Sequence, residues 1–461
     1  MTFSDYINYL RDKRIGVIGF GVSNQPLVRV LLRNGCDVTV CDRRERAQLG
    51  AAGDEAAAQG AKFALGADYL EHLDFDVIFR TPGVLPIVPQ LRRAAQNGAI
   101  LTSEMEAFCN LCPCRILAIT GSDGKTTTST ITAELLRAQG YTVHLGGDIG
   151  TPLFDRIADI RPDDFAVLEL SSFQLHSMHC APDVAIITNI SPNHLDVHPD
   201  LEDYVSAKCS IYRGQRPDGV LVLNAKDAHT PRFAAEAPGS VRYFSSVGPV
   251  ENGVYCSDGV IYRAHGGKAE KLIDVSDIRI PGAHNVENYM AAIAAVEGLV
   301  PDETIRTFAR TFNGVEHRIE LVRTYHGVRF YNDSIASSPS RTIAGLRSFK
   351  EKVILIAGGY DKHIPFDVLG PEIVNHVKLL VLCGATAGKI RAAVEQAPGY
   401  CPGHPEILEV TPFQRAVEAA RDRAQPGDVV TLSPACAAFD QFKNFMERGK
   451  TFKAIVNGWR E

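Results

Sequence analysis

The stretch of sequence that decides the fold is Arg115-Ile-Leu-Ala-Ile-Thr-Gly-Ser-Asp-Gly-Lys-Thr-Thr127. It begins as an apolar run typical of a buried strand, and the residues after it place Ile131, Leu135 and Leu136 on one side of a helix. Glycines between a strand and a helix let backbone N–H groups close on a phosphate, and a lysine there neutralises the phosphate charge. The stretch therefore predicts a parallel α/β sheet with a nucleotide site at the carboxyl end of a strand.

The spacing within this loop is informative. It has the form G-x-x-G-K-T, two residues shorter than the common G-x-x-x-x-G-K-T, which indicates a particular subclass of nucleotide-binding protein. A threonine directly after the lysine can place its hydroxyl on Mg²⁺. The residues predicted to bind the nucleotide phosphates are Gly121, Ser122, Asp123, Gly124, Lys125, Thr126 and Thr127.

Two residues elsewhere fit a metal–phosphate site. Glu169 ends the apolar run that contains Ala166-Val-Leu168, and a carboxylate at a strand end suits a hard cation such as Mg²⁺. The alternative interpretation is that this single glutamate is a solvated residue that only caps the end of the strand. His194 lies beyond the run that ends near Asn189, and by itself it has no assigned role.

A second nucleotide pattern lies near the start of the chain. Gly19-Phe-Gly-Val-Ser-Asn24 resembles the dinucleotide-binding fingerprint with asparagine in place of its last glycine, and Asp42 follows the next predicted strand, where a ribose acceptor belongs. Together with the Lys125 loop, this pattern suggests two nucleotide-bearing ligands. One would be hydrolysed, and the other would keep its nucleotide as a group by which the protein recognises it. A tight strand–helix turn without a ligand is the alternative.

The remaining apolar runs predict three α/β blocks. Strands are expected at 15–19, 37–42 and 76–79, at 115–119, 165–170, 184–190 and 219–224, and at 328–331, 353–357, 379–382 and 429–432. Helical patterns lie between them, which favours parallel sheets, and the stretch 245–275 predicts a small antiparallel hairpin around Asp258-Gly259.

Composition excludes several classes of function. The 461 residues suffice for about three domains. A formal charge of −6 argues against nucleic acid as an obligatory partner. No apolar window reaches the roughly 18 residues of a membrane span, and the mixed polar start, Met1–Arg14, does not predict export.

The cysteines predict a reducing environment. There are 11, mostly single and within apolar segments. The cluster Cys109-Asn-Leu-Cys112-Pro-Cys114 lacks a second ligand pair at a suitable distance, so we interpret it as a linker and not as a zinc site.

Five motifs resemble those of the Mur ligases. They are Thr120–Thr127, Leu168-Glu-Leu-Ser-Ser-Phe-Gln-Leu175, Asn193-His-Leu-Asp196, His284-Asn285 and His317-Arg318. The segment Ser433-Pro-Ala-Cys-Ala-Ala-Phe-Asp-Gln-Phe-Lys-Asn-Phe445 is similar to the member that adds D-glutamate to UDP-N-acetylmuramoyl-L-alanine. The resemblance runs from about residue 14 to the end of the chain.

The resemblance implies an α/β protein of three domains with mainly parallel sheets. Residues 1–103 would be a Rossmann-like UDP-substrate-binding domain, 104–314 a P-loop-like mononucleotide domain that binds ATP, and 315–461 a Rossmann-like domain that binds the amino acid. It implies an ADP-forming ligase of peptidoglycan synthesis, and therefore of cell shape and division, that uses an acyl-phosphate intermediate.

The resemblance also assigns residues. Lys125, His194 and Lys208 would be catalytic, and Thr126, Glu169, His194 and Lys208, the last when carbamylated, would hold two Mg²⁺ ions. By residue type alone, Lys208 reads as an exposed helix lysine. Further ATP contacts would come from Asn285, Asn288, Arg318 and Asp333, with His317 beside them, and Asn285 and Asn288 are one helical turn apart.

The resemblance also implies two substrate pockets. Gly21, Ser23, Asp42, Gly83 and Asp148 would bind the UDP-substrate, and Ser337, Lys362, Ala438, Phe439 and Phe445 would surround D-glutamate. Three positions depart from the better-known pattern: Ile335 replaces a lysine, Ala438 a serine and Asp148 an asparagine. Arg341 or backbone amides are expected to supply the missing donors.

Two other interpretations stay open on the sequence. One is a sister ligase for a different amino acid, or an enzyme like folylpolyglutamate synthase. The other is a non-enzymatic protein, or a nicotinamide-binding module built on the Gly19–Asn24 loop. We expect a cytoplasmic monomer whose partners are its small-molecule substrates.

Overall fold

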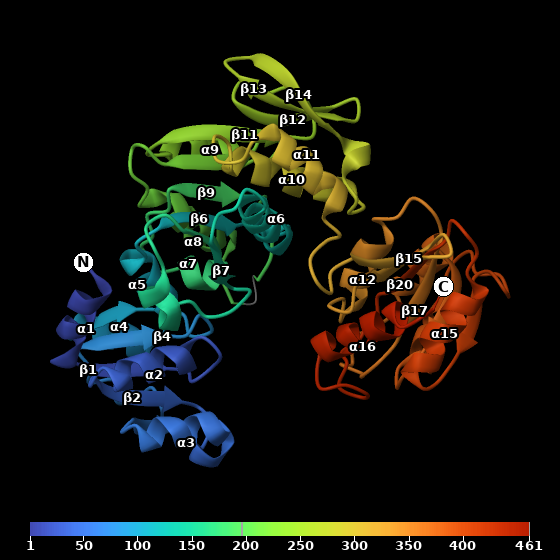
Figure 1. The fold of residues 1–461 in the computed structure, drawn as a ribbon. Coiled ribbons are helices and arrows are strands. Elements are labelled where there is room, and N and C mark those ends of the chain that lie inside the picture. Colours follow the sequence, from blue (N-terminus) through green and yellow to red (C-terminus); the bar gives the residue numbers. More distant parts are fainter. Residues whose placement is uncertain (195–196, 461) are drawn as a thin grey trace. The chain divides into compact units, whose positions relative to one another are not determined.

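The computed structural model describes residues 1–194 and 197–460, which form three sheets with helices between their strands (Figure 1). By the contacts between its Cα atoms the chain divides into two compact units. The first is Met1–Val275 with Glu287–Arg306, and the second is Ser276–Val286 with Thr307–Glu461. The three sheets confirm the three predicted α/β blocks, and the first two sheets lie within the first unit.

The first sheet has five parallel strands in the order β3-β2-β1-β4-β5. Their bounds are β1 (Arg14–Ile18), β2 (Asp37–Asp42), β3 (Lys62–Leu65), β4 (Val77–Arg80) and β5 (Ile100–Thr102). The helical segments are α1 (Phe3–Arg11), α2 (Asn24–Arg33), η1 (Arg46–Leu49), α3 (Gly50–Ala58), α4 (Pro89–Gln96) and α5 (Glu104–Leu111). The strand order reverses between β1 and β4, so the loops after these two strands diverge and leave room for a ligand.

The second sheet has nine strands in the order β14-β13-β12-β11-β10-β9-β6-β8-β7. Pairing is parallel from β7 to β12, through β7 (Val143–Gly147), β8 (Phe165–Glu169), β6 (Arg115–Thr120), β9 (Val184–Ile187), β10 (Val220–Asn224), β11 (Ser240–Ser245) and β12 (Gly253–Ser257). The predicted antiparallel hairpin is confirmed as β12 with β13 (Val260–His265), extended by β14 (Lys268–Asp274). The helical segments are α6 (Lys125–Ala138), η2 (Phe154–Asp159), α7 (Ser172–Leu175), α8 (Leu201–Arg213), α9 (Thr230–Glu236), η3 (Val275–Asp277), α10 (Ala283–Ala295) and α11 (Asp302–Thr311).

The third sheet has the order β15-β16-β20-β17-β18-β19. Only the edge pair of β15 (Glu320–Tyr325) and β16 (Val328–Asn332) is antiparallel, and the sheet continues through β20 (Val429–Leu432), β17 (Val353–Ala357), β18 (Val377–Leu382) and β19 (Glu406–Glu409). Its helices are α12 (Pro339–Leu346), α13 (Leu369–His376), α14 (Ala387–Glu395), α15 (Phe413–Arg423) and α16 (Phe445–Asn457).

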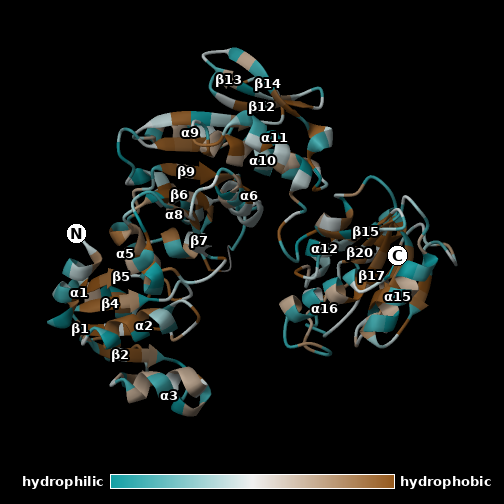
Figure 2. Ribbon diagram, in the orientation of Figure 1, coloured by the Kyte–Doolittle hydropathy of each residue, from teal (hydrophilic) through white to brown (hydrophobic). Residues whose placement is uncertain are grey.

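Apolar strands buried on both faces form the cores. In β17, Val353 and Leu355 pack into one cluster, whereas Ile354 and Ile356 pack into another on the opposite face of the sheet. A two-sided parallel strand must be apolar throughout, which is why these strands read as continuous apolar runs. Figure 2 shows the same concentration of hydrophobic residues on β6, β9 and β17.

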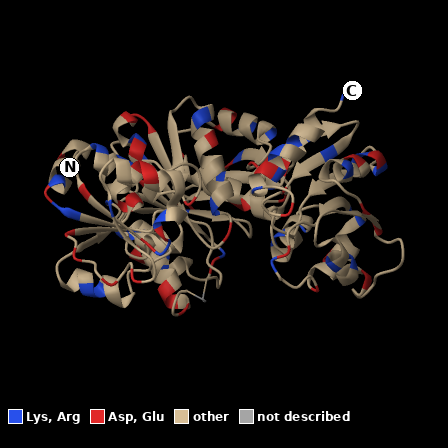
Figure 3. Cartoon of the chain, turned by 90° about the horizontal axis from the view of Figure 1, so that it is seen from below, with Lys and Arg blue, Asp and Glu red and all other residues tan. Residues whose placement is uncertain are grey.

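Charge is mixed on both units. Lysine and arginine alternate with aspartate and glutamate along the ribbon (Figure 3), in keeping with the small formal charge of −6. Within the part of the chain that the structure describes, no helix combines the length and the apolar character that a membrane crossing requires.

One acid of α5 is buried between the first two sheets. Glu104 is 4% exposed, and its Oε1 accepts a hydrogen bond from the backbone N–H of Phe154 at 3.2 Å. Burial raises the pKa of Glu104 to about 7 from its ordinary value of 4.5. The folded protein therefore holds this proton more tightly than the unfolded chain does.

Glu104→Gln is expected to change how stability depends on pH. A raised folded pKa gives stability that is fully present below 4.5 and is lost as the pH rises through about 7. An amide keeps the acceptor for Phe154 and cannot ionise, so the thermal unfolding midpoint of the variant should rise relative to wild type between about pH 5 and about pH 8. The exposed Glu71→Gln is the matched control, and equal behaviour of the two variants would contradict the prediction.

Candidate active site

The phosphate loop lies between β6 and α6, as the sequence predicts. Gly121 and Gly124 have φ values of +147° and +79°, which residues with side chains rarely adopt. A Cβ atom at Gly121 would overlap the side chain of Thr188, and one at Gly124 would overlap Asn288. Both glycines are therefore required by backbone conformation and by space, and α6 begins directly after the second.

The end of β9 supports this loop. The Thr188 hydroxyl donates to the carbonyl oxygen of Asp123 at 2.6 Å, and Asn189 Oδ1 accepts the N–H of Asp123 at 3.0 Å. Ser122 Oγ donates to the carbonyl of Ser191 at 2.9 Å and lies 2.9 Å from the hydroxyl of Tyr204. Sequence reasoning missed these supports because they join residues 65 to 82 positions apart.

A lysine, a hydroxyl and a carboxylate meet at the carboxyl end of β6. Lys125 Nζ donates to the carbonyl oxygens of Gly121 and Ser122, each at 3.1 Å. Glu169 ends β8, the neighbour of β6, and its Oε1 accepts the hydroxyl of Thr126 at 3.3 Å. The structure thus brings together Lys125, Thr126 and Glu169 as predicted.

Lys208 corrects the expectation drawn from its residue type. It was expected to be an exposed helix lysine and is instead 1% exposed, because α8 packs against the sheet beside β6. Its Nζ donates to the carbonyl oxygen of Gly121 at 2.8 Å and lies 4.6 Å from the centre of the Tyr204 ring.

Burial and charge both act on Lys208. Burial lowers the pKa of Lys208 well below its ordinary value, and the positive charge of Lys125 lowers it further. The carboxylates of Asp148, Asp123 and Glu169 oppose this shift. Asp148 follows β7, and its N–H donates to the carbonyl oxygen of Glu169 at 2.8 Å, so this predicted UDP-substrate residue lies at the edge of the second sheet.

His194 follows β9, on the other side of β6 from Glu169. It has a φ of +56°, and its ring centre lies 5.0 Å from that of Phe173. Phe173 also stacks on His198, whose Nδ1 lies 2.7 Å from Asp203 Oδ2 and whose Nε2 lies 3.0 Å from the hydroxyl of Ser172. Leu195 and Asp196, the rest of the predicted motif, lie outside the described residues.

A carboxylate shared by two histidines was also missed. Asp203 Oδ1 lies 3.1 Å from Nε2 of His176, and together with His198 these residues form a group of possible metal ligands. The group joins α8 to the segment that follows Glu169. No signal in the sequence separated these histidines from ordinary surface residues.

The predicted UDP residues of the first sheet follow β1, β2 and β4. Gly21 and Ser23 come after β1, Asp42 ends β2, and Gly83 lies in the turn after β4, so all four are at the carboxyl edge of the sheet. Asn24, in place of the last fingerprint glycine, is buried and donates to the carbonyl oxygens of Ile18 and Gly19.

Asp42 is an ionised acceptor at this edge. Burial by itself would raise its pKa, but hydrogen bonds from the Arg44 guanidinium and from the N–H of Phe20 lower the pKa of Asp42 to about 2. The Phe20 N–H lies 2.7 Å from Asp42 Oδ2. The carboxylate therefore fixes the Gly19–Asn24 turn in addition to offering an acceptor for a ligand.

The two asparagines of α10 have different neighbours. Asn288 Oδ1 accepts the hydroxyl of Thr128 at 3.2 Å and abuts Gly124, which places it against the phosphate loop. Asn285, one turn earlier, donates to the carbonyl oxygen of Pro281 at 2.6 Å. The first contact places Asn288 beside the loop predicted to bind phosphate, and its role in ATP binding stays a prediction.

A buried acid lies among the predicted ATP residues of the second unit. Burial raises the pKa of Asp333 to about 7, against the hydrogen bond from Ser433 and the positive charge of Arg318, both of which lower it. The Ser433 hydroxyl lies 2.7 Å from Asp333 Oδ2. The charge of Arg318 therefore acts on Asp333, and their joint role in binding ATP stays a prediction.

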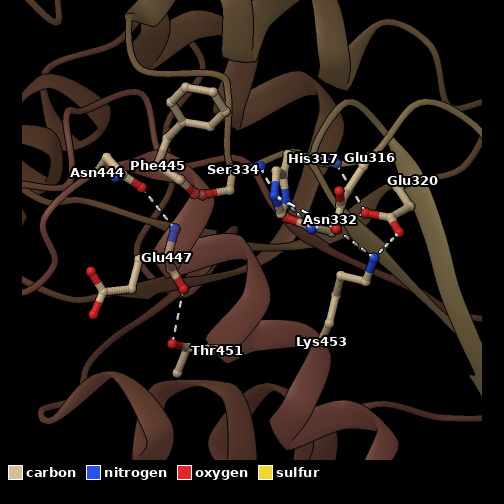
Figure 4. A network of polar contacts seen from close by, with 10 residues as sticks. All are labelled: Glu316, His317, Glu320, Asn332, Ser334, Asn444, Phe445, Glu447, Thr451 and Lys453. Carbon is tan, nitrogen blue, oxygen red and sulfur yellow. Dashed lines mark hydrogen bonds and ion pairs between the residues drawn. The ribbon is translucent and has the colours of Figure 1, made fainter. Parts of the chain in front are cut away.

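Figure 4 shows the network around His317. Asn332 donates to Nδ1 of His317 at 2.9 Å, and the backbone N–H of His317 donates to Glu320 Oε2 at 3.0 Å. Lys453 of α16 forms an ion pair with Glu320. Burial lowers the pKa of His317, which favours the neutral ring, and the hydrogen bond from Asn332 uses Nδ1 as an acceptor.

The residues predicted to bind D-glutamate come from the loops after β16, β17 and β20 and from the start of α16. Lys362 Nζ donates to the carbonyl oxygen of Ser337 at 3.4 Å, so these two are neighbours. Ala438 is buried, whereas Phe439 is 62% exposed with its ring edge on Tyr360. Phe445 begins α16 and packs edge-on against His317.

Arg448 holds the loops after β16 and β20 together, and the sequence analysis missed it. It is 2% exposed and donates to the carbonyl oxygens of Ser334 at 2.9 Å and Cys436 at 3.0 Å. The Ser334 hydroxyl in turn donates to the carbonyl oxygen of Phe445 at 2.8 Å (Figure 4).

Two family models match the chain. The Mur ligase middle domain matches residues 119–296, and the Mur ligase glutamate ligase domain matches residues 317–436. Among curated relatives, the UDP-N-acetylmuramoylalanine--D-glutamate ligase of Acetivibrio thermocellus is 50% identical over 98% of both chains. The protein of the same name from Ruminiclostridium cellulolyticum is 48% identical over 97% of both chains.

Solved structures share the fold. The UDP-N-acetylmuramate-alanine ligase from Thermotoga maritima aligns with a TM-score of 0.56 over 97% of this chain and 99% of its own, at 17% identity. A pseudomurein peptide ligase of type C from Methanothermus fervidus aligns with a TM-score of 0.51, at 19% identity. With half of its residues identical to a curated relative along nearly its whole length, and with both family models matched, the chain belongs to the Mur ligase family.

Proposed function

We propose that the protein is an ATP-dependent ligase that joins D-glutamate to UDP-N-acetylmuramoyl-L-alanine in peptidoglycan precursor synthesis. The observation that carries this proposal is the meeting of Lys125, Lys208 and Glu169 at the carboxyl end of β6. The near full-length similarity to D-glutamate ligases supports the choice of amino acid. Because the reaction consumes ATP, we place it in the cytoplasm, and we expect the enzyme to act as a monomer.

The chemistry has two steps. A carboxylate is a poor electrophile, so an oxygen of the alanyl carboxylate first attacks the terminal phosphorus of ATP, and ADP leaves. The amine of D-glutamate then attacks the acyl carbon, a proton is lost, and phosphate leaves from the tetrahedral intermediate. Each step brings anions together, so catalysis depends on positioning and on charge neutralisation.

The loop Gly121–Thr127 would hold the phosphates of ATP. Its backbone N–H groups and the N-terminus of α6 attract anions, and the Lys125 ammonium neutralises the terminal phosphate. Asn288 would contact the nucleotide from α10. In the second unit, Asn285, Arg318 and Asp333 would bind the adenine and ribose.

The side chains fit Mg²⁺. A buried carboxylate and a hydroxyl within hydrogen-bond distance of one another, Glu169 and Thr126, are hard oxygen donors beside the phosphate loop. Thr126, Glu169 and His194 would hold the ions, of which we propose two. When bound, the ions would supply electrophilic neutralisation of the phosphate and acyl-phosphate oxygens.

Lys208 suits carbamylation. A neutral amine, which its lowered pKa favours, attacks CO₂ and loses a proton to give a carbamate. This replaces a buried cation with an anion that has two oxygens and that can serve as a further metal ligand. The anion would also relieve the repulsion between Lys208 and Lys125.

The three blocks would divide the substrates among them. We propose that residues 1–103 bind the UDP-substrate through Gly21, Ser23, Asp42 and Gly83, with Asp148 contributing from 104–314, the ATP-binding block. Residues 315–461 would bind D-glutamate, with Ser337, Lys362, Ala438, Phe439 and Phe445 around it. A dicarboxylate requires fixed donors at both ends, and Lys362 beside Ser337 provides one such point.

Arg341→Ala is expected to raise the KM for D-glutamate by about tenfold, because one charge-assisted hydrogen bond to a carboxylate is lost. Arg341 is exposed and its Nη1 lies 3.4 Å from the carbonyl oxygen of Ile335, the position where the better-known pattern has lysine. Steady-state kinetics at saturating ATP measure the effect. The exposed Arg347→Ala is the control, and an unchanged KM for D-glutamate in Arg341→Ala would remove the proposed compensation.

A substrate panel tests the proposed function. Purified protein is incubated with ATP, Mg²⁺ and UDP-N-acetylmuramoyl-L-alanine, and ADP release is followed with D-glutamate, L-alanine, meso-diaminopimelate or L-lysine. We expect release with D-glutamate alone. Release with another of these amino acids would assign the chain to a sister ligase, and NADH binding without ATP turnover would favour a nicotinamide-binding module.

A further inference from the structure

Arg80 is a charged side chain buried at the end of β4. It is 1% exposed, and burial lowers the pKa of its guanidinium to about 10, opposed only by the charge of Glu106. Within residues 1–194 and 197–460, no carboxylate forms an ion pair with it. Burying an unpaired cation is unfavourable, so the groups that it binds must compensate.

Those groups belong to the second sheet and its helices. Nη2 donates to the carbonyl oxygen of Phe173 at 3.0 Å and to that of Gln174 at 3.4 Å. Nε and Nη2 both donate to the Ser177 hydroxyl, at 3.0 and 2.8 Å. A helix as short as α7 leaves its carbonyls without partners inside the helix, and the guanidinium supplies them.

Both ends of this contact adjoin predicted site residues. On the first sheet, Nη1 donates to the carbonyl oxygens of Thr81 and Val84, which enclose the turn that contains Gly83 of the predicted UDP pocket. On the second, the ring of Phe173 packs against His194, and α7 begins three residues after Glu169. One side chain therefore joins the turn expected to hold the UDP-substrate to the segment expected to hold the metal.

We propose that Arg80 is a positioning residue that couples binding of the UDP-substrate on the first sheet to the geometry of the ATP–metal site on the second. This inference rests on the proposed function. The substrate's nucleotide is distant from the reacting carboxylate, and its binding energy raises the rate only if it orders the reacting groups. A rigid link between the Gly83 turn and α7 supplies that ordering.

The coupling predicts a particular kinetic signature. In Arg80→Met the kcat should fall by roughly 10- to 100-fold, because the reacting groups are less well aligned. The dissociation constants of UDP-N-acetylmuramoyl-L-alanine and of a non-hydrolysable ATP analogue, each measured alone, should stay within about twofold of wild type, because Arg80 is not among the residues expected to contact either ligand. Arg80→Lys keeps the charge with fewer donors and should recover part of the kcat.

Calorimetric titration measures the coupling itself. In the wild type, saturating UDP-substrate should tighten binding of the ATP analogue, and in Arg80→Met this enhancement should disappear. Ser177→Ala removes the hydroxyl that accepts two of the bonds and is the milder variant for use if Arg80→Met does not fold. Arg92→Met, at an exposed position of α4, is the matched control.

Each outcome of these titrations either supports or overturns the proposed coupling. Loss of the enhancement in Arg80→Met or Ser177→Ala, with Arg92→Met unchanged, supports the proposal. The proposal is overturned if the wild type shows no enhancement or if the enhancement persists in both variants. A uniform weakening of the binding of every ligand also overturns it. Failure of the proposed function can be told apart from failure of this inference. If the proposed function is wrong, the wild type forms no product with D-glutamate, while the titration with both ligands still tests Arg80.

Discussion

Lys125→Ala is expected to reduce ADP release by about 10³-fold when UDP-N-acetylmuramoyl-L-alanine and D-glutamate are both present. The Lys125 ammonium lies over the loop Gly121–Thr127, where it donates to two loop carbonyls. In the reaction it would neutralise the phosphate that is being transferred, and no other cation of the loop can do so. A coupled ADP assay with saturating substrates measures the loss.

The control for this variant is Lys268→Ala, which removes an exposed lysine from β14 at the far edge of the same sheet. Its rate should equal that of the wild type. Consumption of ATP at wild-type speed by Lys125→Ala would contradict the assignment of the loop to the transferred phosphate.

Lys208→Ala is expected to lose activity by about 10²- to 10³-fold, because a proposed metal-binding anion is removed from the centre of the site. The unmodified amine is buried, and its lowered pKa favours the neutral form that attacks CO₂. A carbamate signal should appear in the carbon-13 spectrum of wild-type protein equilibrated with labelled bicarbonate, and it should be absent from the variant.

Lys208→Arg separates the charge from the modification. An arginine keeps a cation at this position and cannot form the carbamate, so this variant should be as inactive as Lys208→Ala. Full activity in Lys208→Arg, or a wild-type rate that is the same in CO₂-depleted and bicarbonate-supplemented buffer, would exclude carbamylation as a requirement.

The local patterns of the sequence predicted the sheets well. The apolar runs at 115–119 and 353–357 are β6 and β17, and the glycines at 121 and 124 adopt the positive φ values that a phosphate loop requires. These features depend on residues close in sequence, where periodicity and conformational preference decide the outcome. The edge strand β15, which pairs antiparallel to β16, was not predicted because its apolar pattern is interrupted by charged residues.

The environment of side chains was predicted less well. Lys208 was expected to be exposed, and the sequence analysis gave Arg80 no role, yet both are buried against residues 87 to 97 positions away. Such burial arises when helices pack on sheets, which no local pattern reports. His198 and Arg448 were missed for the same reason. The buried charged residues Lys208, Arg80 and Arg448 are therefore those that the sequence alone described least well.

Transfer of oxygen-18 tests the central claim most directly. UDP-N-acetylmuramoyl-L-alanine labelled in its alanyl carboxylate is incubated with ATP, Mg²⁺ and D-glutamate, and the released phosphate is analysed by mass spectrometry. An acyl-phosphate route predicts one labelled oxygen in each phosphate, formed in equal amounts with ADP and the D-glutamyl product. Unlabelled phosphate, or phosphate released without the D-glutamyl product, would contradict the account.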